Sequence, residues 1–403
     1  MNVLFEPFTL KGEINAPSSK SVAHRYLIGA ALCEGTSVIS ELELCDDTRA
    51  TIGCLKALGA EITEEKGRVT VSSGDFLKRS AVCADCRESG STLRFLIPLA
   101  LCSDKKITFS GSKRLFERPL DAYEELCRNN GFLFEKGECS LTLQGSLKGT
   151  EYTLRGDVSS QFVSGLMLAL VMLNRDSVIN IQPPFVSRPY AELTAEILRQ
   201  FGADVKFTDP CTVTVKKAAL HPVEAKADAD YSSAAFLEGF NCIGSDIKIK
   251  GLNPDSLQAD RVYKEYFDLL SEAAPRLDVS DCPDLAPVLI ALAALKNGAV
   301  LTGTDRLKTK ESDRALSMHE ELKKMGGGLI FGKDTLTVPP QSLSRSTEPL
   351  SSHNDHRIAM ALSLILSRVG GEIAGAEAVK KSYPAFFEDI KRSGGKITLQ
   401  EEV

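Results

Sequence analysis

The sequence predicts an α/β protein of two domains, each made of three copies of one strand-and-helix unit. Two recurring patterns support this: an apolar helix with a polar start, and an amphipathic helix followed by a hairpin. The length of 403 residues suits two or three domains of about 150 residues each. With 43% hydrophobic and 25% charged residues, the composition is that of a soluble globular protein and excludes a disordered chain or a disulfide scaffold.

The first pattern begins with small polar or charged residues and continues as a strongly apolar helix. Its six copies start at Ser19, Ser89, Ser159, Ser232, Asp284 and His356. The intervals between successive starts are 70, 70, 73, 52 and 72 residues. A helix that is apolar on all sides is typically buried in the core of a large protein. We therefore expect six buried helices, one in each unit.

The second pattern is an amphipathic helix, a glycine-containing stop and a short hairpin. It is clear in CLKALGAEITEEKGRVTV, which starts at Cys54, and in ELKKMGGGLIFGKDTLTV, which starts at Glu321. Glycine ends such a helix because it takes a left-handed backbone conformation without steric cost. The fourth copy lacks the hairpin, which accounts for the short interval of 52 residues. Each unit is thus predicted as βαβαββ, with the fourth unit truncated.

The spacing of the units also predicts the domain boundary. Three units span about 210 residues, which is the size of one domain. We expect residues 18–228 to form one domain and residues 229–403 most of the other. The strand that precedes Pro17 has no partner in this count, so residues 1–17 are predicted to join the C-terminal domain.

The starts of the buried helices carry residues that are unusual for a purely structural helix. A helix N-terminus offers free N–H groups and the positive end of the helix dipole, so it is a natural anion site. Basic residues recur there, at Lys20, Arg25, Arg94 and Arg357. Alone, each would be explained as a solvated charge, but their recurrence in a chain of net charge −6 indicates a ligand with several negative charges. Loops outside these helices are expected to add Arg118, Ser187, Tyr190, Lys310, Glu311, Arg314 and Lys381.

Other kinds of site are not supported by the sequence. There is no GxxxxGK(S/T) motif, and no GxGxxG motif opens a βαβ unit. Cys83 and Cys86 form one CxxC without a second pair, whereas zinc needs about four ligands, so we expect neither a metal nor an organic cofactor. The acidic charge argues against nucleic-acid binding, and no apolar run reaches the roughly 18 residues of a membrane helix. Eleven cysteines without an export signal suit reduced thiols in a cytoplasm.

Nine short motifs follow one another along the whole chain. They are PSSKSVAHR, ESGSTLRF, FERP, VSSQF, VSRPY, DCPDLAP, KTKESDR, NDHRIAM and KKSYP. In these motifs the sequence resembles the bacterial type of the 5-enolpyruvylshikimate-3-phosphate synthase (3-phosphoshikimate 1-carboxyvinyltransferase) family. The resemblance implies a two-domain inside-out α/β barrel, with buried helices inside, sheets outside and the active site in the interdomain cleft. It also implies that the enolpyruvyl group of phosphoenolpyruvate is transferred to the 5-hydroxyl of shikimate 3-phosphate by addition and elimination through a tetrahedral intermediate, with release of phosphate.

The resemblance assigns roles to the residues that match the family's motifs. Shikimate 3-phosphate would be held by Lys20, Ser21, Arg25, Ser159, Ser160, Gln161, Ser187, Tyr190, Asp284 and Lys310. Phosphoenolpyruvate would contact Lys20, Gly90, Arg118, Gln161, Arg314, Arg357 and Lys381. Asp284 would take the 5-hydroxyl proton and Glu311 would manage the proton at the methylene carbon, with Lys20, Lys310 and His356 in the same catalytic group. Independently, such a reaction needs an acid, a base and fixed cations beside two polyanions.

Two alternative functions stay open at this point. UDP-N-acetylglucosamine enolpyruvyl transferase shares the implied fold and chemistry, but that family has a reactive cysteine in a loop where this chain reads SGSKRLFERP. A non-catalytic binder of an anionic metabolite would not need both Asp284 and Glu311 among the cations, because buried carboxylates weaken anion binding.

The expected partners follow from the same interpretation. We expect the two small-molecule substrates as partners, and neither nucleic acid nor a membrane. We also expect the protein to be a monomer located in the cytoplasm. Because Gly90 has no side chain, space remains beside the phosphoenolpyruvate site, and we expect glyphosate to compete with that substrate.

Overall fold

The computed structural model describes residues 1–79, 81–173 and 175–400. The chain divides into two compact units. One is continuous, Ser18–Asp228, and the other is discontinuous, Met1–Pro17 together with Ala229–Val403. Each unit has a hydrophobic core formed from its own residues. Within the described part of the chain, no helix combines the length and the hydropathy needed to cross a membrane.

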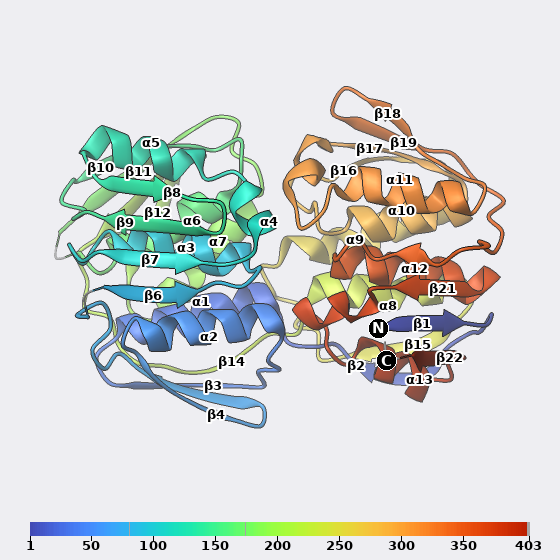
Figure 1. Cartoon of the computed structure of the whole chain (residues 1–403), viewed down its shortest axis with the longest axis horizontal. Coiled ribbons are helices and arrows are strands. Elements are labelled where there is room, and N and C mark those ends of the chain that lie inside the picture. Colours follow the sequence, from blue (N-terminus) through green and yellow to red (C-terminus); the bar gives the residue numbers. More distant parts are fainter. Residues whose placement is uncertain (80, 174, 401–403) are drawn as a thin grey trace. The chain divides into compact units, whose positions relative to one another are not determined.

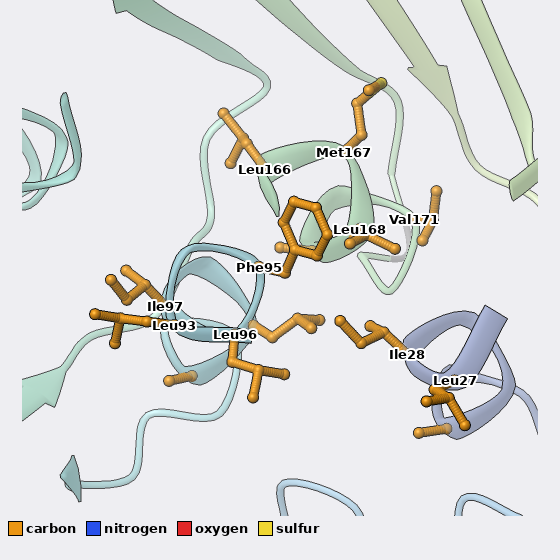
Figure 2. Close-up of a cluster of buried hydrophobic side chains, with 14 of the residues drawn as sticks. Leu27, Ile28, Leu93, Phe95, Leu96, Ile97, Leu166, Met167, Leu168 and Val171 are labelled. Atoms are coloured by element: carbon orange, nitrogen blue, oxygen red, sulfur yellow. The ribbon is translucent and has the colours of Figure 1, made fainter. Parts of the chain in front are cut away.

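In the residues that the structure describes, six buried helices form the interior of the two units, three in each. In the continuous unit they are α1 (Lys20–Leu32), α3 (Gly90–Ala100) and α6 (Ser160–Leu170). In the discontinuous unit they are α8 (Tyr231–Cys242), α10 (Ala286–Leu295) and α12 (His356–Val369). Side chains from α1, α3 and α6, among them Ile28, Phe95 and Leu168, form one apolar cluster (Figure 2). The predicted buried helices are therefore confirmed.

Five sheets repeat one strand order, in which a parallel pair is extended by two antiparallel strands. In the continuous unit these sheets are β14 (Glu224–Lys226), β3 (Thr36–Ser40), β5 (Arg68–Ser72), β4 (Glu61–Glu65); β6 (Val82–Asp85), β7 (Ile107–Ser110), β9 (Ser140–Gln144), β8 (Leu133–Lys136); and β10 (Glu151–Arg155), β11 (Ser177–Gln182), β13 (Thr212–Lys216), β12 (Asp204–Asp209). In the discontinuous unit they are β16 (Arg276–Asp278), β17 (Ala299–Thr302), β19 (Thr335–Val338), β18 (Ile330–Gly332); and β20 (Leu350–Ser351), β21 (Gly371–Ala374), β1 (Asn2–Phe5), β22 (Ile397–Gln400). In four of these sheets a buried helix connects the two parallel strands, whereas β14 and β3 are far apart in the sequence. Short turns connect the antiparallel strands of the hairpins β4–β5, β8–β9, β12–β13 and β18–β19.

Of the six βαβαββ repeats, the fourth is the truncated one, as predicted. Its strand β15 (Asp246–Lys250) pairs with β2 (Lys11–Asn15), in a parallel sheet of two strands. Without a hairpin, the chain continues through η1 (Ala259–Val262) directly to the helix of the second pattern. The α/β fold of six βαβαββ units is thus present, with the fourth shortened.

The strand that precedes Pro17 has its partners in the C-terminal half of the chain. Strand β1 lies between β21 and β22 and pairs antiparallel with both. In Figure 1 the blue strand β1 accordingly lies among orange and red elements. In the continuous unit, strand β14 also pairs with a strand far away in the sequence, because it lies at the edge of the first sheet beside β3.

A helix of the second pattern follows each buried helix along the chain. These helices are α2 (Asp46–Ala57), α5 (Asp121–Asn130), α7 (Arg188–Gln200), α9 (Tyr263–Glu272), α11 (Arg314–Lys324) and α13 (Phe386–Arg392). The predicted glycine stop is clear after α5, where Gly131 has a φ of 70° and its N–H bonds back to the carbonyl of Arg128. Such a left-handed residue closes the last turn of a helix.

Candidate active site

Asp284 lies at the centre of a group of cations in the discontinuous unit. It precedes α10 by two residues, and Leu285 rather than Asp284 takes the cap position of that helix. One carboxylate oxygen accepts hydrogen bonds from Arg314 Nη1 at 2.6 Å and from Lys310 Nζ at 3.3 Å. The other oxygen accepts from Arg357 Nη2 at 3.0 Å. Three cations from three segments therefore face one carboxylate.

The Arg314 guanidinium is almost fully buried and bonds to three carboxylates. Besides Asp284, it donates from Nη2 to Glu311 Oε2 at 2.8 Å and from Nε to Asp355 Oδ2 at 3.0 Å. Charge-assisted bonds to a planar fork are strongly directional, so they fix the carboxylates as well as the guanidinium. Arg314 is the first residue of α11, and the prediction that it lies in a loop is wrong because Asp313 already caps the helix.

Asp355 connects the starts of two helices. Its Oδ1 accepts a hydrogen bond from the N–H of Arg357 at 2.9 Å and so caps α12. The Arg357 guanidinium donates to Ser232 Oγ on α8 as well as to Asp284. The imidazole of His356 is buried, and its Nδ1 lies 3.8 Å from Asp355 Oδ1. Because Asp355 also binds Arg314, it joins α12 to α11.

Electrostatics keep Asp284 ionised. Burial alone would raise the pKa of its carboxyl, but the charges of Arg357, Lys310 and Arg314 outweigh burial and hold that pKa well below its usual range. Burial lowers the pKa of the Lys310 ammonium to about 8, although the Asp284 charge opposes the shift. A lysine with this pKa exchanges protons near neutral pH. The group can therefore bind anions and move protons.

Lys381 approaches the same group from a short helix. It is the last residue of η3 (Ala376–Lys381). Its ammonium donates to the main-chain carbonyl of Asn354 at 2.5 Å. Since Asn354 directly precedes Asp355, Lys381 lies against the turn of chain that starts α12.

Arg25 is the centre of a second group, in the continuous unit. It lies on α1 and is buried. Its guanidinium donates to the carbonyls of Ser21 and Tyr190, at 2.5 and 2.9 Å, and to Thr194 Oγ1 at 2.6 Å. Burial lowers the pKa of Arg25 to about 10, which leaves it charged at neutral pH. Tyr190 and Thr194 both belong to α7, so the prediction of a loop at Tyr190 is wrong.

Gln161 joins the starts of α6 and α3. Its Oε1 accepts from Arg94 Nη1 at 2.8 Å, and its Nε2 donates to Ser91 Oγ at 2.9 Å. Ser159 caps α6, because its Oγ accepts from the N–H of Gln161 at 3.3 Å, and Ser160 is the first helical residue. Polar side chains are thus present at the N-terminal turns of both helices, where the dipole favours an anion.

Two further predicted residues stand at helix starts of the continuous unit. Lys20 opens α1, and its ammonium lies 2.8 Å from Asp47 Oδ2 on α2. Ser187 takes the cap position of α7 with a left-handed φ of 52°. A residue other than glycine is strained in this conformation, and such strain is frequent at functional sites.

Gly90 packs directly against Arg118. Gly90 is the first residue of α3, and Arg118 follows the short helix α4 (Lys113–Glu117). A Cβ atom at Gly90 would lie 2.6 Å from Arg118 Nη1, which is shorter than real contacts of a Cβ. Any other residue at position 90 would therefore displace the Arg118 guanidinium.

The predicted residues of the discontinuous unit thus form one connected group, whereas those of the continuous unit form several separate contacts. Direct bonds link Asp284, Lys310, Glu311, Arg314 and Arg357. In the continuous unit the contacts are divided among an Arg25 set, a Gln161 set, the Lys20–Asp47 pair and the Gly90–Arg118 contact. Sequence reasoning missed the partners Asp47, Thr194, Ser232 and Asp355. Of these, Asp355 had a signal, since it lies inside the NDHRIAM motif, and so did Ser232, which starts the fourth copy of the apolar-helix pattern.

Comparison with known proteins identifies the family of the chain. The family model of EPSP synthase (3-phosphoshikimate 1-carboxyvinyltransferase) matches residues 6–390. The chain is 37% identical to the 3-phosphoshikimate 1-carboxyvinyltransferases of Clostridium perfringens and Clostridium kluyveri, over 98% of this chain and 98% of each relative.

Solved structures agree on the fold. The chain superimposes on EPSP synthase from Acinetobacter baumannii with a TM-score of 0.80 at 24% identity, covering 99% of this chain and all of that one. It also superimposes on the enolpyruvyl transferase NikO from Streptomyces tendae, with a TM-score of 0.75 at 16% identity and coverage of 100% and 99% of the two chains. With its sequence matched from residue 6 to residue 390 and its relatives aligned almost end to end, the chain belongs to the EPSP synthase family.

Proposed function

We propose that this chain transfers the enolpyruvyl group of phosphoenolpyruvate to the 5-hydroxyl of shikimate 3-phosphate and releases phosphate, a step of the shikimate pathway to aromatic amino acids. Membership in the family supports the reaction. The observation that carries the mechanism is the Asp284 carboxylate, which three cations hold in its ionised form. The ionised carboxylate provides the base, and the cations around it provide the anion site.

The proton transfers follow from the groups around Asp284. Asp284 would take the proton of the 5-hydroxyl of shikimate 3-phosphate while the hydroxyl oxygen attacks C2 of phosphoenolpyruvate. At the same time, Glu311 would pass a proton to the methylene carbon. The product of this addition is a tetrahedral intermediate. In the elimination, Glu311 would take a proton back from the new methyl group, the bond from C2 to the phosphate oxygen breaks and phosphate departs. Lys20, Lys310 and His356 complete the proposed catalytic group, and Lys310 can donate a proton because its pKa is about 8.

The substrates would be bound by the side chains already described. We assign shikimate 3-phosphate to Lys20, Ser21, Arg25, Ser159, Ser160, Gln161, Ser187, Tyr190, Asp284 and Lys310. We assign phosphoenolpyruvate to Lys20, Gly90, Arg118, Gln161, Arg314, Arg357 and Lys381. Two polyanions repel each other, and several fixed cations offset this repulsion.

A phosphate-release assay tests the proposal. We expect release only when phosphoenolpyruvate and shikimate 3-phosphate are both present. UDP-N-acetylglucosamine in place of shikimate 3-phosphate should give none. Release with the nucleotide sugar would favour the related transferase, and binding of both ligands by calorimetry without turnover would favour a non-catalytic binder.

The cysteines argue against the nucleotide-sugar transferase. The two that lie nearest in sequence to the segment SGSKRLFERP are Cys102 and Cys127. Burial raises the pKa of both thiols to about 12. A thiol with such a pKa is almost entirely protonated at neutral pH and reacts poorly as a nucleophile.

We also propose that the chain acts as a monomer in the cytoplasm. All eleven cysteines are free thiols, which suits a reducing compartment.

We further propose that glyphosate competes with phosphoenolpyruvate. Because a Cβ at position 90 would displace Arg118, Gly90→Ala should weaken glyphosate inhibition. The same substitution should raise the KM for phosphoenolpyruvate by about tenfold, the loss of one charge-assisted bond.

The matched control for this variant is Gly53→Ala. Gly53 lies on α2, and its Cβ would meet nothing within 4 Å. Inhibition constants should be measured at several phosphoenolpyruvate concentrations. Inhibition that does not depend on that concentration would contradict competition.

A further inference from the structure

A strained turn precedes α12. His353 and Asn354 have φ values of 51° and 53°, so two successive residues other than glycine lie in the left-handed region. Each such residue is disfavoured, and the conformation persists only where surrounding contacts impose it. The turn Ser351–Asp355 must therefore be held by its neighbours.

Glu321 of α11 supplies contacts that hold this turn. Its carboxylate is 1% exposed. One oxygen accepts from the N–H of Ser351 at 2.9 Å, and the other lies 2.7 Å from His353 Nε2. Lys324 Nζ bonds to both oxygens, at 3.1 and 2.9 Å. Burial alone would raise the pKa of Glu321, but the bonds from His353, Lys324 and Ser351 outweigh it and lower that pKa, so the carboxylate stays ionised.

The turn presents two groups to the site around Asp284. The carbonyl of Asn354 receives the ammonium of Lys381, and Asp355 receives Arg314. Arg314 and Glu321 are seven residues apart on α11, which is about two helical turns and therefore places them on one face. Through these two side chains α11 holds the turn at both ends.

We propose that Glu321 is a positioning residue for the active site. Its bonds to Ser351 and His353 impose the left-handed turn. This turn then positions Lys381 and Asp355. The inference rests on the proposed function, in which Lys381 binds phosphoenolpyruvate. Glu321 itself touches no substrate in this proposal.

An alternative role for the cluster of Glu320, Glu321 and His353 is to bind a metal ion. Ligand atoms of Glu320, Glu321 and His353 lie within 4.8 Å of one another. However, Lys324 already bonds both oxygens of Glu321, and its positive charge repels a second cation. The contacts therefore favour a positioning role.

The decisive comparison is Glu321→Gln against Glu320→Gln. Both substitutions remove one negative charge from α11, but Glu320 is half-exposed and lies 3.9 Å from His353. We expect Glu321→Gln to raise the KM for phosphoenolpyruvate about tenfold, the loss of one charge-assisted bond, while the KM for shikimate 3-phosphate is unchanged. Hydrogen exchange of the turn, measured without substrate, should accelerate by a similar factor. Glu320→Gln should leave both readouts at their wild-type values.

Each other outcome overturns the inference. Equal effects of the two variants would mean that only charge matters. Unchanged exchange in Glu321→Gln would mean that the carboxylate does not hold the turn, and a proportional loss of all activity would indicate a purely structural role. Activity restored to a chelator-treated protein by Zn²⁺ or Mn²⁺ alone would identify a metal site.

A second pair keeps the test valid if Glu321→Gln does not fold. His353→Gln keeps an N–H donor for Glu321 and should behave nearly as wild type, whereas His353→Phe should reproduce the effect on phosphoenolpyruvate. Failure of the proposed function is recognised separately, because wild-type protein would then release no phosphate, while exchange of the turn would still report on Glu321.

Discussion

Lys310 is a single residue whose titration lies within reach of physiological pH. Burial lowers the pKa of its ammonium from the ordinary 10.5 to about 8, although Asp284 is 3.3 Å away. In the unfolded chain the same side chain keeps its proton to higher pH. Unfolded protein therefore binds more protons between about pH 8 and 10.5, and Lys310 by itself adds to stability as the pH rises through this window.

The same shift predicts the pH dependence of activity. If a charged Lys310 is required, kcat/KM should fall as the pH rises above about 8. Lys310→Arg keeps the charge because arginine does not lose its proton in this range, so the fall should move to higher pH. Lys308→Arg is the control, since Lys308 is exposed and paired with Asp305. An unchanged profile in Lys310→Arg would assign the fall to another group.

Asp284 provides the sharpest residue-level test of the chemistry. Asp284→Asn keeps the shape of the side chain and removes the base. We expect kcat to fall by at least about 10²-fold, the usual contribution of a general base. Binding of phosphoenolpyruvate should not weaken, because the three cations lose a competing negative charge.

The control for Asp284→Asn lies three residues earlier. Asp281 is exposed, and Asp281→Asn should behave as wild type. Steady-state kinetics and calorimetry on both variants give the comparison. Near-normal turnover by Asp284→Asn would remove the assignment of the base.

At the scale of elements, the sequence allowed the buried helices to be predicted but not all helix starts. The segment APVLIALAAL is apolar on all sides, and residues 286–294 are indeed buried. The segments KESDR and VSRPY have no apolar periodicity, so Arg314 and Tyr190 were expected in loops. Helices nevertheless start there, because Asp313 caps α11 and Pro189 is tolerated in the first turn of α7.

The contacts between elements were beyond sequence reasoning. Arg314 and Asp355 are 41 residues apart, and Arg25 and Thr194 are 169 residues apart. No periodicity in one segment specifies a partner at such a distance, since the pairing depends on how the layers pack. The motif residues were therefore found, whereas most of their partners were not.

The glycine that ends α5 gives an element-level prediction. Gly131 has a φ of 70°, and its Cβ position is open. Gly131→Ala should lower the free energy of unfolding by about 1 kcal/mol through backbone strain alone. Gly53→Ala, at an exposed position inside α2, should raise it by about 1 kcal/mol. Urea unfolding decides, and equal changes in the two variants would contradict the conformational argument.

At the scale of the whole molecule, one unit is a single continuous segment of the chain, whereas the other is formed by two segments that are far apart in the sequence. The core of the continuous unit consists only of its own residues. We expect a fragment of residues 18–228 to unfold cooperatively when followed by circular dichroism. A fragment of residues 229–403 lacks β1 and β2 and should not, because β21, β22 and β15 lose partners. Cooperative unfolding of both fragments would contradict this reasoning.

The central place of β1 has a consequence for synthesis on the ribosome. Asn2 and Glu372, which are hydrogen-bonded across β1 and β21, are 370 positions apart. At 5–20 residues per second, the ribosome needs roughly 20–70 s to make the intervening chain. For that time β1 stays unpaired, although the continuous unit is complete once residue 228 has been made. An unpaired strand invites association with other nascent chains. Shielding of these first residues by a chaperone during translation is the expected price of this topology.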